Sequence, residues 1–246
     1  MDRMLFVAMS GAKETLLAQS TNNNNLANAS TPGFLSELQQ FRSMPVFGDG
    51  FPSRVYGMSE RPAVDFSHGS MIHSGRDLDV AINGNGWLAV QAADGNEAYS
   101  RRGDLKIDVN GILTTGNDLP VMGNAGPIAI PPAEKVEIAA DGTISIRPLG
   151  QAANELAIID RIKMVNPDLS ELDKGLDGLI RLKSGEQADA DANVQLTTGA
   201  IESSNVNIVD AMVDMIELSR RYELQVKMMK SAEEIDSASA GIMRLE

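Results

Sequence analysis

The feature that most constrains this chain is a seven-residue pattern in its last forty residues. Two sets of positions recur every seven residues: Met212, Ser219, Val226, Glu233 and Ala240, and three positions on, Met215, Tyr222, Met229, Asp236 and Met243. Together the sets follow one seam of an α-helix about four heptads long. Polar members interrupt the seam, which favours packing among several different helices over a simple zipper. The alternative is an ordinary amphipathic helix lying on a β domain.

The start of this helix is marked in the sequence. Asn207 is a good N-cap residue, and Asp210 follows three positions later, near the positive end of the helix dipole. Val206 and Ala211 have the spacing of a hydrophobic staple. These signals predict that the helix begins immediately after Asn207.

A second, shorter seam occupies the first thirty residues. Its members alternate by four and three positions: Leu5, Met9, Ala12, Leu16, Gln19, Asn23 and Leu26. The asparagines at positions 22–25 weaken this helix toward its end, because their side chains compete for backbone hydrogen bonds. Pro32 and Gly33 then form a turn that stops it. Helices at both chain ends can pair with each other and leave further faces for other chains.

The middle of the chain has the two-residue period of β-strands. Apolar residues alternate with polar or small ones around positions 78–82, 105–109, 136–138 and 144–146. Asp94-Gly95, Asn110-Gly111 and Asp141-Gly142 lie between such runs, and these pairs favour tight hairpins because they accept positive φ angles. The pattern predicts a compact, mostly antiparallel β domain.

The predicted fold class is α+β, with discontinuous N- and C-terminal coiled-coil-type helices and a central, mostly antiparallel β domain. Residues 35–75 show no sustained period and contain Pro45, Pro52 and Pro62, which predicts an extended connector. We therefore expect an N-terminal assembly helix in residues 1–34, the connector in 35–75 and the β domain in 76–200. Residues 201–246 are expected to form a C-terminal assembly helix that pairs with the first.

Composition excludes several classes of function. The formal net charge is −13 and no block of Lys or Arg stands out, which argues against nucleic acids and anionic membrane surfaces as partners. The chain has no cysteine, so it forms neither a disulfide framework nor a thiolate metal site. Lys13 and Glu14 interrupt the apolar N-terminal patch, so no cleaved secretory signal is expected. No apolar run approaches the roughly 20 residues that a membrane-spanning helix needs.

The sequence contains no arrangement that points to catalysis. Gly84 and Gly86 form a G-x-G pair without a following helix or third glycine, so we interpret them as a tight bend before a strand starting at Trp87. The two histidines, His68 and His73, lack a third ligand at metal-binding spacing and are expected in loops. We expect no catalytic, cofactor-binding or metal-binding residues, no cofactor and no enzyme activity.

Four segments carry a family signature. They are NNLANASTPGF at residues 24–34, GRDLDVAINGNGW at 75–87, YSRRG at 99–103, and GAIESSNVN at 199–207, which is followed by RRYE at 220–223. In this order they resemble the NNLAN and T-x-G-F, G-x-x-LDVAI-x-G-x-G-[FW], YTR-x-G, G-x-L-E-x-SNVN and R-x-YE motifs of flagellar rod and hook proteins. The resemblance covers nearly the whole chain.

The resemblance implies a structural subunit of the bacterial flagellar basal-body rod, which polymerises through its terminal helices into a torque-transmitting axle for motility. Implied partners are copies of the chain, other proximal and distal rod proteins, and the flagellar type III export apparatus. The implied location is the periplasmic rod, reached without a cleaved signal peptide and without direct membrane insertion. The opening MDRMLFVAMSGA resembles the proximal-rod branch most. The distal-rod branch is the alternative, and a secreted β-domain binding module is a further one.

These considerations define a set of candidate residues. The predicted assembly interface comprises Leu5, Met9, Ala12, Leu16, Asn23, Leu26, Asn28, Met212, Met215, Ser219, Tyr222, Val226 and Met229. The predicted structural turns are at Pro32, Gly33, Gly84 and Gly86. The asparagines at 22–25 and 28 are interpreted either as hydrogen-bonding groups at the end of the helix or as a merely polar helix end.

Overall fold

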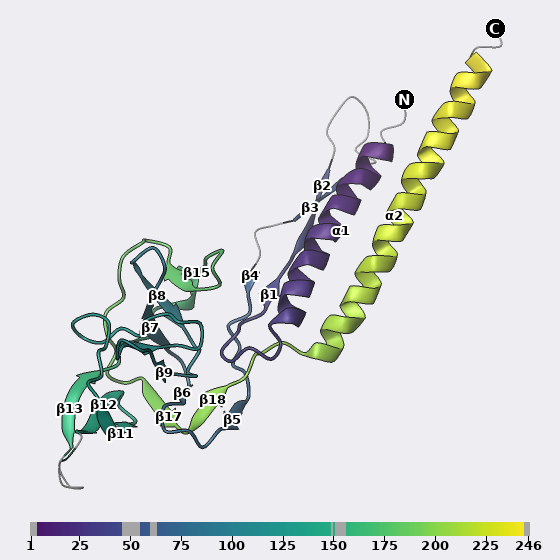
Figure 1. Ribbon diagram of the computed structural model, residues 1–246. Helices are drawn as coiled ribbons and strands as arrows, with labels where there is room; N and C mark the ends of the chain where they lie inside the picture. Colours follow the sequence, from purple (N-terminus) through teal and green to yellow (C-terminus); the bar gives the residue numbers. More distant parts are fainter. Residues whose placement is uncertain (1–3, 46–54, 60–62, 149, 151–155, 244–246) are drawn as a thin grey trace. The chain divides into compact units, whose positions relative to one another are not determined.

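The computed structural model describes residues 4–45, 55–59, 63–148, 150 and 156–243 (Figure 1). It contains an N-terminal helix, a central antiparallel β region and a C-terminal helix, so the predicted α+β class is confirmed. The chain forms two compact units. Unit 1 comprises Met1–Ala29, Ser36–Asp65 and Val206–Glu246, and unit 2 comprises Ser30–Leu35 and Phe66–Asn205.

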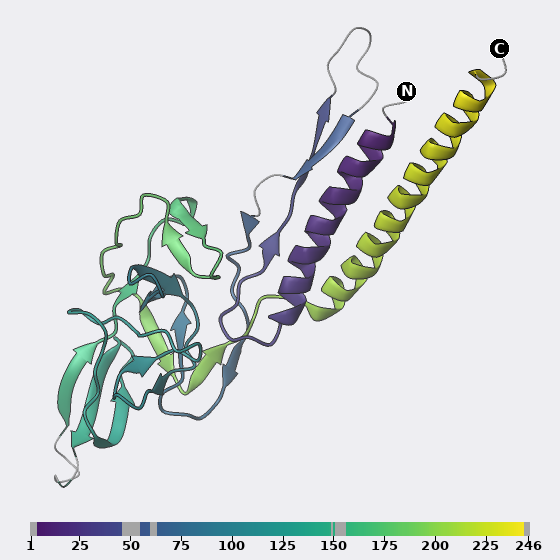
Figure 2. The same ribbon diagram turned by 45° about the horizontal axis from the view of Figure 1, so that its top comes forward.

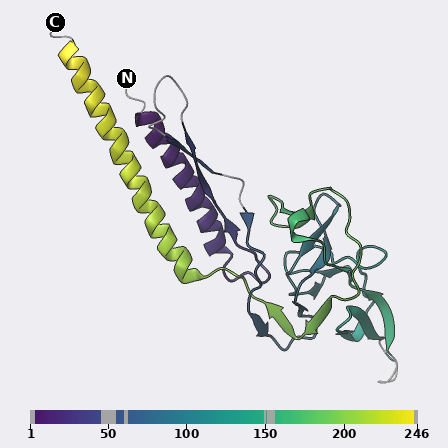
Figure 3. The same cartoon turned by 180° about the vertical axis from the view of Figure 1, so that it is seen from behind.

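Unit 1 is built on two helices, α1 (Met4–Ala27) and α2 (Ile208–Met243). They lie side by side and antiparallel, so that the start of α1 and the end of α2 are at the same end of the unit (Figures 1 and 3). Asn207 caps α2 as predicted, because its Oδ1 accepts a hydrogen bond of 3.0 Å from the backbone N–H of Val209. No helix in the described part of the chain has both the length and the hydrophobicity needed to cross a membrane.

Four short strands complete unit 1. They are β1 (Glu37–Leu38), β2 (Phe41–Pro45), β3 (Val55–Ser59) and β4 (Ala63–Val64). β1 pairs with β4 and β2 with β3, both antiparallel. The β2–β3 pair lies along the side of α1 away from α2 (Figure 2). These four strands lie within residues 35–75, the segment expected as an extended connector, and each has an antiparallel partner.

Unit 2 contains the remaining strands and one short 3-10 helix, η1 (Leu169–Glu171). The strands are β5 (Met71–His73), β6 (Val80–Asn83), β7 (Trp87–Gln91), β8 (Glu97–Ser100), β9 (Lys106–Ile107), β10 (Leu113–Thr114), β11 (Ala133–Ile138), β12 (Thr143–Pro148), β13 (Ala157–Arg161), β14 (Met164–Val165), β15 (Leu172–Lys174), β16 (Ile180–Leu182), β17 (Gln195–Thr198) and β18 (Ala200–Glu202). One sheet has the order β14-β7-β8-β16-β15 and another the order β11-β12-β13. β9–β10, β6–β17 and β5–β18 form two-stranded sheets.

The three predicted hairpin turns are confirmed. Gly95, Gly111 and Gly142 have φ angles of 83°, 81° and 83°, and each follows Asp or Asn. The strands that flank them pair antiparallel: β7 with β8, β9 with β10 and β11 with β12. Local turn chemistry therefore decides these pairings.

The hydrophobic core of unit 2 joins residues from both halves of its chain. Fully buried members include Ile82, Leu105, Leu113, Ile144 and Ile162. Val194 and Leu196 from the last part of the unit belong to the same cluster. The core therefore holds the beginning and the end of the β region together before the chain returns to unit 1.

Candidate functional site: terminal helices and motif network

α1 contacts α2 through small side chains. Ala8, Ala12 and Ala18 are buried on α1. Gly11 lies so close to α2 that a Cβ atom there would be 2.9 Å from Nε2 of Gln225. Small residues on α1 let the two helices approach closely.

Amide hydrogen bonds fix the alignment of the two helices. The hydroxyl of Thr15 lies 3.1 Å from Oε1 of Gln225, and Nδ2 of Asn22 donates a bond of 2.7 Å to the carbonyl oxygen of Ala211. Each joins one residue of α1 to one residue of α2, so sliding the helices past each other breaks both. We infer that these bonds determine the register of the pair.

Asn25 connects α1 to the strand that follows it. Its Nδ2 donates a bond of 2.9 Å to the carbonyl oxygen of Glu37, and its Oδ1 accepts one of 2.9 Å from the Glu37 N–H. Asn25 is only 8% exposed. The asparagine run therefore supplies specific hydrogen bonds at Asn22 and Asn25, whereas the side chains of Asn23 and Asn24 are exposed.

The predicted interface residues fall into three groups in the structure. Ala12 is buried; Leu26, Asn28, Met215, Tyr222, Val226 and Met229 are half-buried; and Leu5, Met9, Leu16, Asn23, Met212 and Ser219 are exposed. Four of the five buried positions of α1, Ala8, Thr15, Ala18 and Asn25, lie one residue before a position of the predicted seam, as do the half-buried Gly11 and Asn22. The fifth, Ala12, belongs to the predicted seam itself. On α2 the covered seam is Ala211, Met215, Leu218, Tyr222, Gln225, Met229 and Ala232.

This one-residue shift has a physical cause. One residue turns the helix by about 100°, so two neighbouring seams with identical spacing coexist on α1. The small-residue seam takes the contact with α2, and the larger apolar side chains remain on the adjoining surface. Leu5, Met9 and Leu16 are 39%, 53% and 47% exposed. A role for these exposed residues between subunits stays a prediction.

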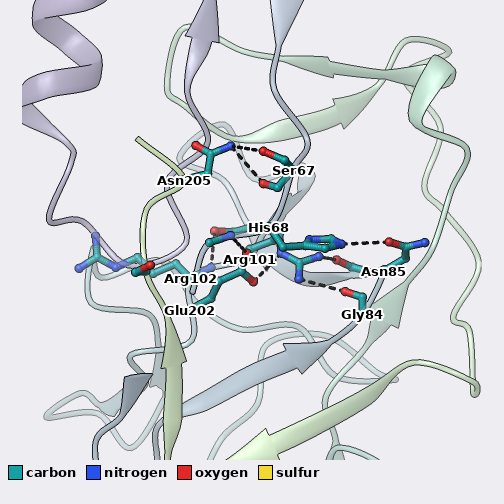
Figure 4. A network of polar contacts seen from close by, with 12 residues as sticks. Ser67, His68, Gly84, Asn85, Arg101, Arg102, Glu202 and Asn205 are labelled. Carbon is teal, nitrogen blue, oxygen red and sulfur yellow. Dashed lines mark hydrogen bonds and ion pairs between the residues drawn. The ribbon is translucent and has the colours of Figure 1, made fainter. Parts of the chain in front are cut away.

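A buried ion pair in unit 2 links the family motifs (Figure 4). Nε of Arg101 lies 2.7 Å from Oε2 of Glu202, and both side chains are 2% exposed. The same guanidinium donates bonds of 2.9 Å and 3.0 Å to the carbonyl oxygens of Gly86 and Gly84. It also lies 5.7 Å from the ring centre of Trp87. One arginine thus holds the glycine turn, the tryptophan and the C-terminal motif together.

Glu202 extends this network to the N-terminal turn. Its Oε1 accepts a bond of 3.0 Å from the Gly69 N–H, and its carbonyl oxygen accepts one of 2.9 Å from the Gly33 N–H. Gly33 has a φ of 65°, and a side chain there would overlap the backbone of Arg101. Gly33 of the T-P-G-F turn is therefore required for both conformation and space.

The residue after this turn is held by a lysine. Nζ of Lys174 lies 4.4 Å from the ring centre of Phe34 and donates a bond of 2.9 Å to the carbonyl oxygen of Leu35. Sequence reasoning identified the motifs but not their mutual contacts, because residues 33, 86, 101 and 202 are far apart along the chain. The available signal in the sequence was one arginine and one glutamate, opposite charges that belong to separate motifs.

Several other predictions concern single side chains. Gly84 and Gly86 have positive φ angles of 81° and 136° immediately before β7 begins at Trp87. Trp87 is buried, with 3% of its surface exposed. His68 contacts Asn85, with Nε2 3.1 Å from Oδ1. His73 lies in β5 rather than in a loop, because its strand pairs with β18. No group of three or more His, Asp or Glu residues within the described ranges is arranged to hold a metal ion.

Family models place this fold in a class of flagellar proteins. Residues 5–34 match the flagella basal body rod protein model, and residues 81–146 match the flagellar hook protein FlgE/F/G D1 domain. Residues 197–242 match the flagellar basal body rod FlgEFG protein C-terminal model. The matched segments correspond to α1, part of the β region, and α2 with the chain that leads into it.

Whole-chain comparisons narrow this class. The chain is 43% identical to the flagellar basal-body rod protein FlgF of Escherichia coli strain K12, with 95% of each chain covered. It is 40% identical to FlgF of Salmonella typhimurium strain LT2, again over 95% of each chain. Identity to the flagellar basal-body rod protein FlgG of Bacillus subtilis strain 168 is 31%, over 95% of this chain and 96% of the relative. The chain therefore belongs to the flagellar basal-body rod protein family, and it is more similar to these FlgF proteins than to that FlgG.

Proposed function

We propose that this chain is a structural subunit of the bacterial flagellar basal-body rod that polymerises through α1 and α2. The observation that carries the proposal is the surface of the helix pair. Small residues of α1 lie at the contact between the helices, while large apolar side chains remain exposed on both helices. Phe6 and Met9 on α1 are 56% and 53% exposed, and Val213 and Ile216 on α2 are 57% and 55% exposed. Apolar surface of this kind favours burial against further helices.

The predicted interface residues suit this role. Leu5, Met9, Leu16 and Met212 lie on exposed surface next to the seam between the helices. In the proposal, residues 1–34 and 201–246 are the assembly segments, residues 35–75 connect, and residues 76–200 form the β domain. Shared helix packing, repeated at every subunit, gives the torsional stiffness that torque transmission requires.

The proposal includes partners and location. The partners are copies of this chain, other proximal and distal rod proteins, and the flagellar export apparatus. The location is the periplasmic part of the basal body, without direct membrane insertion. The chain acts as a structural element rather than an enzyme. The chain is 43% identical to FlgF of Escherichia coli and 31% identical to FlgG of Bacillus subtilis. We take FlgF as the proximal-rod branch and FlgG as the distal-rod branch, so this difference favours the proximal rod.

Replacing Met229 by aspartate tests the proposal. Met229 is half-buried on the covered seam of α2, so Met229→Asp places a charge in a packed helix layer. In a flagellated host whose own FlgF is replaced by this chain, Met229→Asp should abolish swimming in soft agar. The fluorescence melting curve of Trp87, the one tryptophan of the chain, should not change, because Trp87 lies in unit 2.

Ser231→Asp is the matched control. Ser231 is exposed on the same helix, two residues away, and the substitution adds the same charge. Swimming should be retained. Normal swimming of the Met229→Asp strain would contradict the assembly role of α2, provided that the unchanged chain restores motility and the host without either chain does not swim.

A further inference from the structure

Charges on α2 are arranged in three bands. Three acidic residues come first, followed by four basic residues with one acidic residue among them, and then by three acidic residues. In order they are Asp210, Asp214 and Glu217; Arg220, Arg221, Glu223, Lys227 and Lys230; and Glu233, Glu234 and Asp236. Every one of these side chains is exposed. In contrast, α1 carries only Lys13 and Glu14 over its 24 residues.

A fixed displacement brings opposite bands together. If a parallel copy of α2 is displaced by thirteen residues, four pairs of opposite charge are level with each other: Asp214 with Lys227, Glu217 with Lys230, Arg220 with Glu233, and Arg221 with Glu234. At 1.5 Å per residue this displacement is about 20 Å. Two like-charge pairs occur at the same displacement, Asp210 with Glu223 and Glu223 with Asp236. Four attractive pairs outweigh two repulsive ones.

The directions of these side chains suit two parallel copies of α2 that lie side by side. At about 100° per residue, residues thirteen apart point in directions roughly 140° apart on the helix. The first members of the pairs are therefore centred on one flank of the seam that contacts α1, and the second members are centred on the other flank, each set on average roughly 110° from that seam. One copy thus presents one flank while its neighbour presents the opposite flank. This is a head-to-tail contact, which continues from copy to copy.

We propose that α2 docks against α2 of a second copy of this chain, parallel to it and displaced axially by thirteen residues, through complementary charge bands. The inference rests on the proposed rod function, since it specifies how copies align within an assembly. The chain as a whole is strongly acidic, so copies repel one another unless a basic region meets an acidic one. The basic band of α2 supplies that region, and it acts within the Debye length of about 8 Å at physiological salt.

Pairing within one helix is the competing explanation for the bands. Arg221 does form an ion pair with Glu217 one turn away. Lys227 and Lys230 form no ion pair among the described residues, although Glu223 and Glu234 are each four residues from one of them. An experiment must therefore separate contacts within a chain from contacts between chains.

Two complementary charge reversals make this separation. One variant carries Lys227→Glu and Lys230→Glu, and the other carries Asp214→Lys and Glu217→Lys. Each reversal turns two attractive pairs per contact into repulsive pairs, which should weaken copy-to-copy association roughly tenfold. Each variant expressed alone, in place of the host's own FlgF, should give a much smaller swimming ring.

Expression of both variants in one cell should restore swimming, because copies can then alternate and each reversed band meets an opposite charge. Contacts within a single helix are not restored by a second chain. The chain carrying all four changes should also swim. Glu223→Lys is the matched control, and it should not reduce swimming because it removes the two like-charge pairs.

Circular dichroism of each purified full-length variant verifies that α2 remains helical. Normal swimming of either reversal alone would overturn the proposal, and so would failure of the two folded, exported variants to rescue each other. Failure of mutual rescue would indicate that the charge bands of α2 contact a different rod protein. Both results leave the proposed function intact as long as Met229→Asp abolishes swimming, so the two failures are distinguishable.

Discussion

Arg101 shows how one side chain can define a family's motifs. Its guanidinium is buried, ion-paired to Glu202 and bonded to two glycine carbonyl groups of a turn. A lysine has a single ammonium group and does not reproduce this planar arrangement. The arginine, the two glycines and the glutamate come from separate motifs but share one structural role, which is to stabilise unit 2.

Loss of Arg101 should destabilise unit 2 strongly. Arg101→Met keeps the length of the side chain but leaves the Glu202 carboxylate buried and unpaired, which costs roughly 3–5 kcal/mol. Urea unfolding of the full chain, followed by Trp87 fluorescence, measures this effect. Lys135→Met is the control. It breaks the exposed pair with Glu137 and should leave the midpoint unchanged. An unchanged midpoint for Arg101→Met would show that the buried pair does not stabilise the unit.

Tyr99 gives the β region a dependence on alkaline pH. Burial raises the pKa of Tyr99 to about 12, although the backbone N–H of Ala188 donates to its hydroxyl oxygen at 2.7 Å and partly opposes this rise. In the unfolded chain tyrosine ionises near a pKa of about 10. The folded state therefore keeps the neutral phenol, and its contribution to stability is complete below pH 10 and lost between pH 10 and 12.

Tyr99→Phe isolates this contribution. The difference in unfolding free energy between the unchanged chain and Tyr99→Phe, measured with urea from pH 9 to 12, should fall as pH rises. Lysines titrate in the same range in both proteins, so their effect cancels in the comparison. A constant difference over this range would contradict a raised pKa for Tyr99.

Helices and hairpins could be predicted from sequence because short-range chemistry decides them. Asn207 marked the start of α2, and three Asp-Gly or Asn-Gly pairs marked hairpins that the structure contains. β1 to β4 were not predicted, because they are two to five residues long and lack alternation. β1 is joined to α1 by the Asn25–Glu37 bonds, which no local sequence pattern indicates. The seam of α1 was predicted one residue away, since spacing alone does not choose between two adjacent seams.

Neighbouring asparagines of α1 should respond in opposite directions to alanine. Asn25→Ala leaves the backbone N–H and carbonyl of Glu37 without their side-chain partners and should cost about 1–3 kcal/mol. Asn23 is exposed, so Asn23→Ala should stabilise the helix by up to about 0.7 kcal/mol through its higher helix propensity. Thermal unfolding monitored by helical circular dichroism compares them. Equal effects of the two substitutions would refute a specific role for Asn25.

The two units of the whole molecule are stabilised by different kinds of contact. Unit 2 has a closed apolar core and a buried ion pair. Unit 1 holds its two helices with small residues and amide bonds and keeps large apolar side chains on its surface. The family and its order of segments could be predicted from motifs. The contacts that join the motifs in unit 2 could not, because they connect residues far apart in sequence.

Isolation of basal bodies measures whether this chain enters the rod through its helix pair. The host in which this chain replaces its own FlgF is grown with either the unchanged chain or Met229→Asp, and the amount of each in purified basal bodies is compared by mass spectrometry. The unchanged chain should be recovered with the rod, and the Met229→Asp chain should be exported but absent from it. Equal recovery of both chains would contradict assembly through the packed pair of α1 and α2.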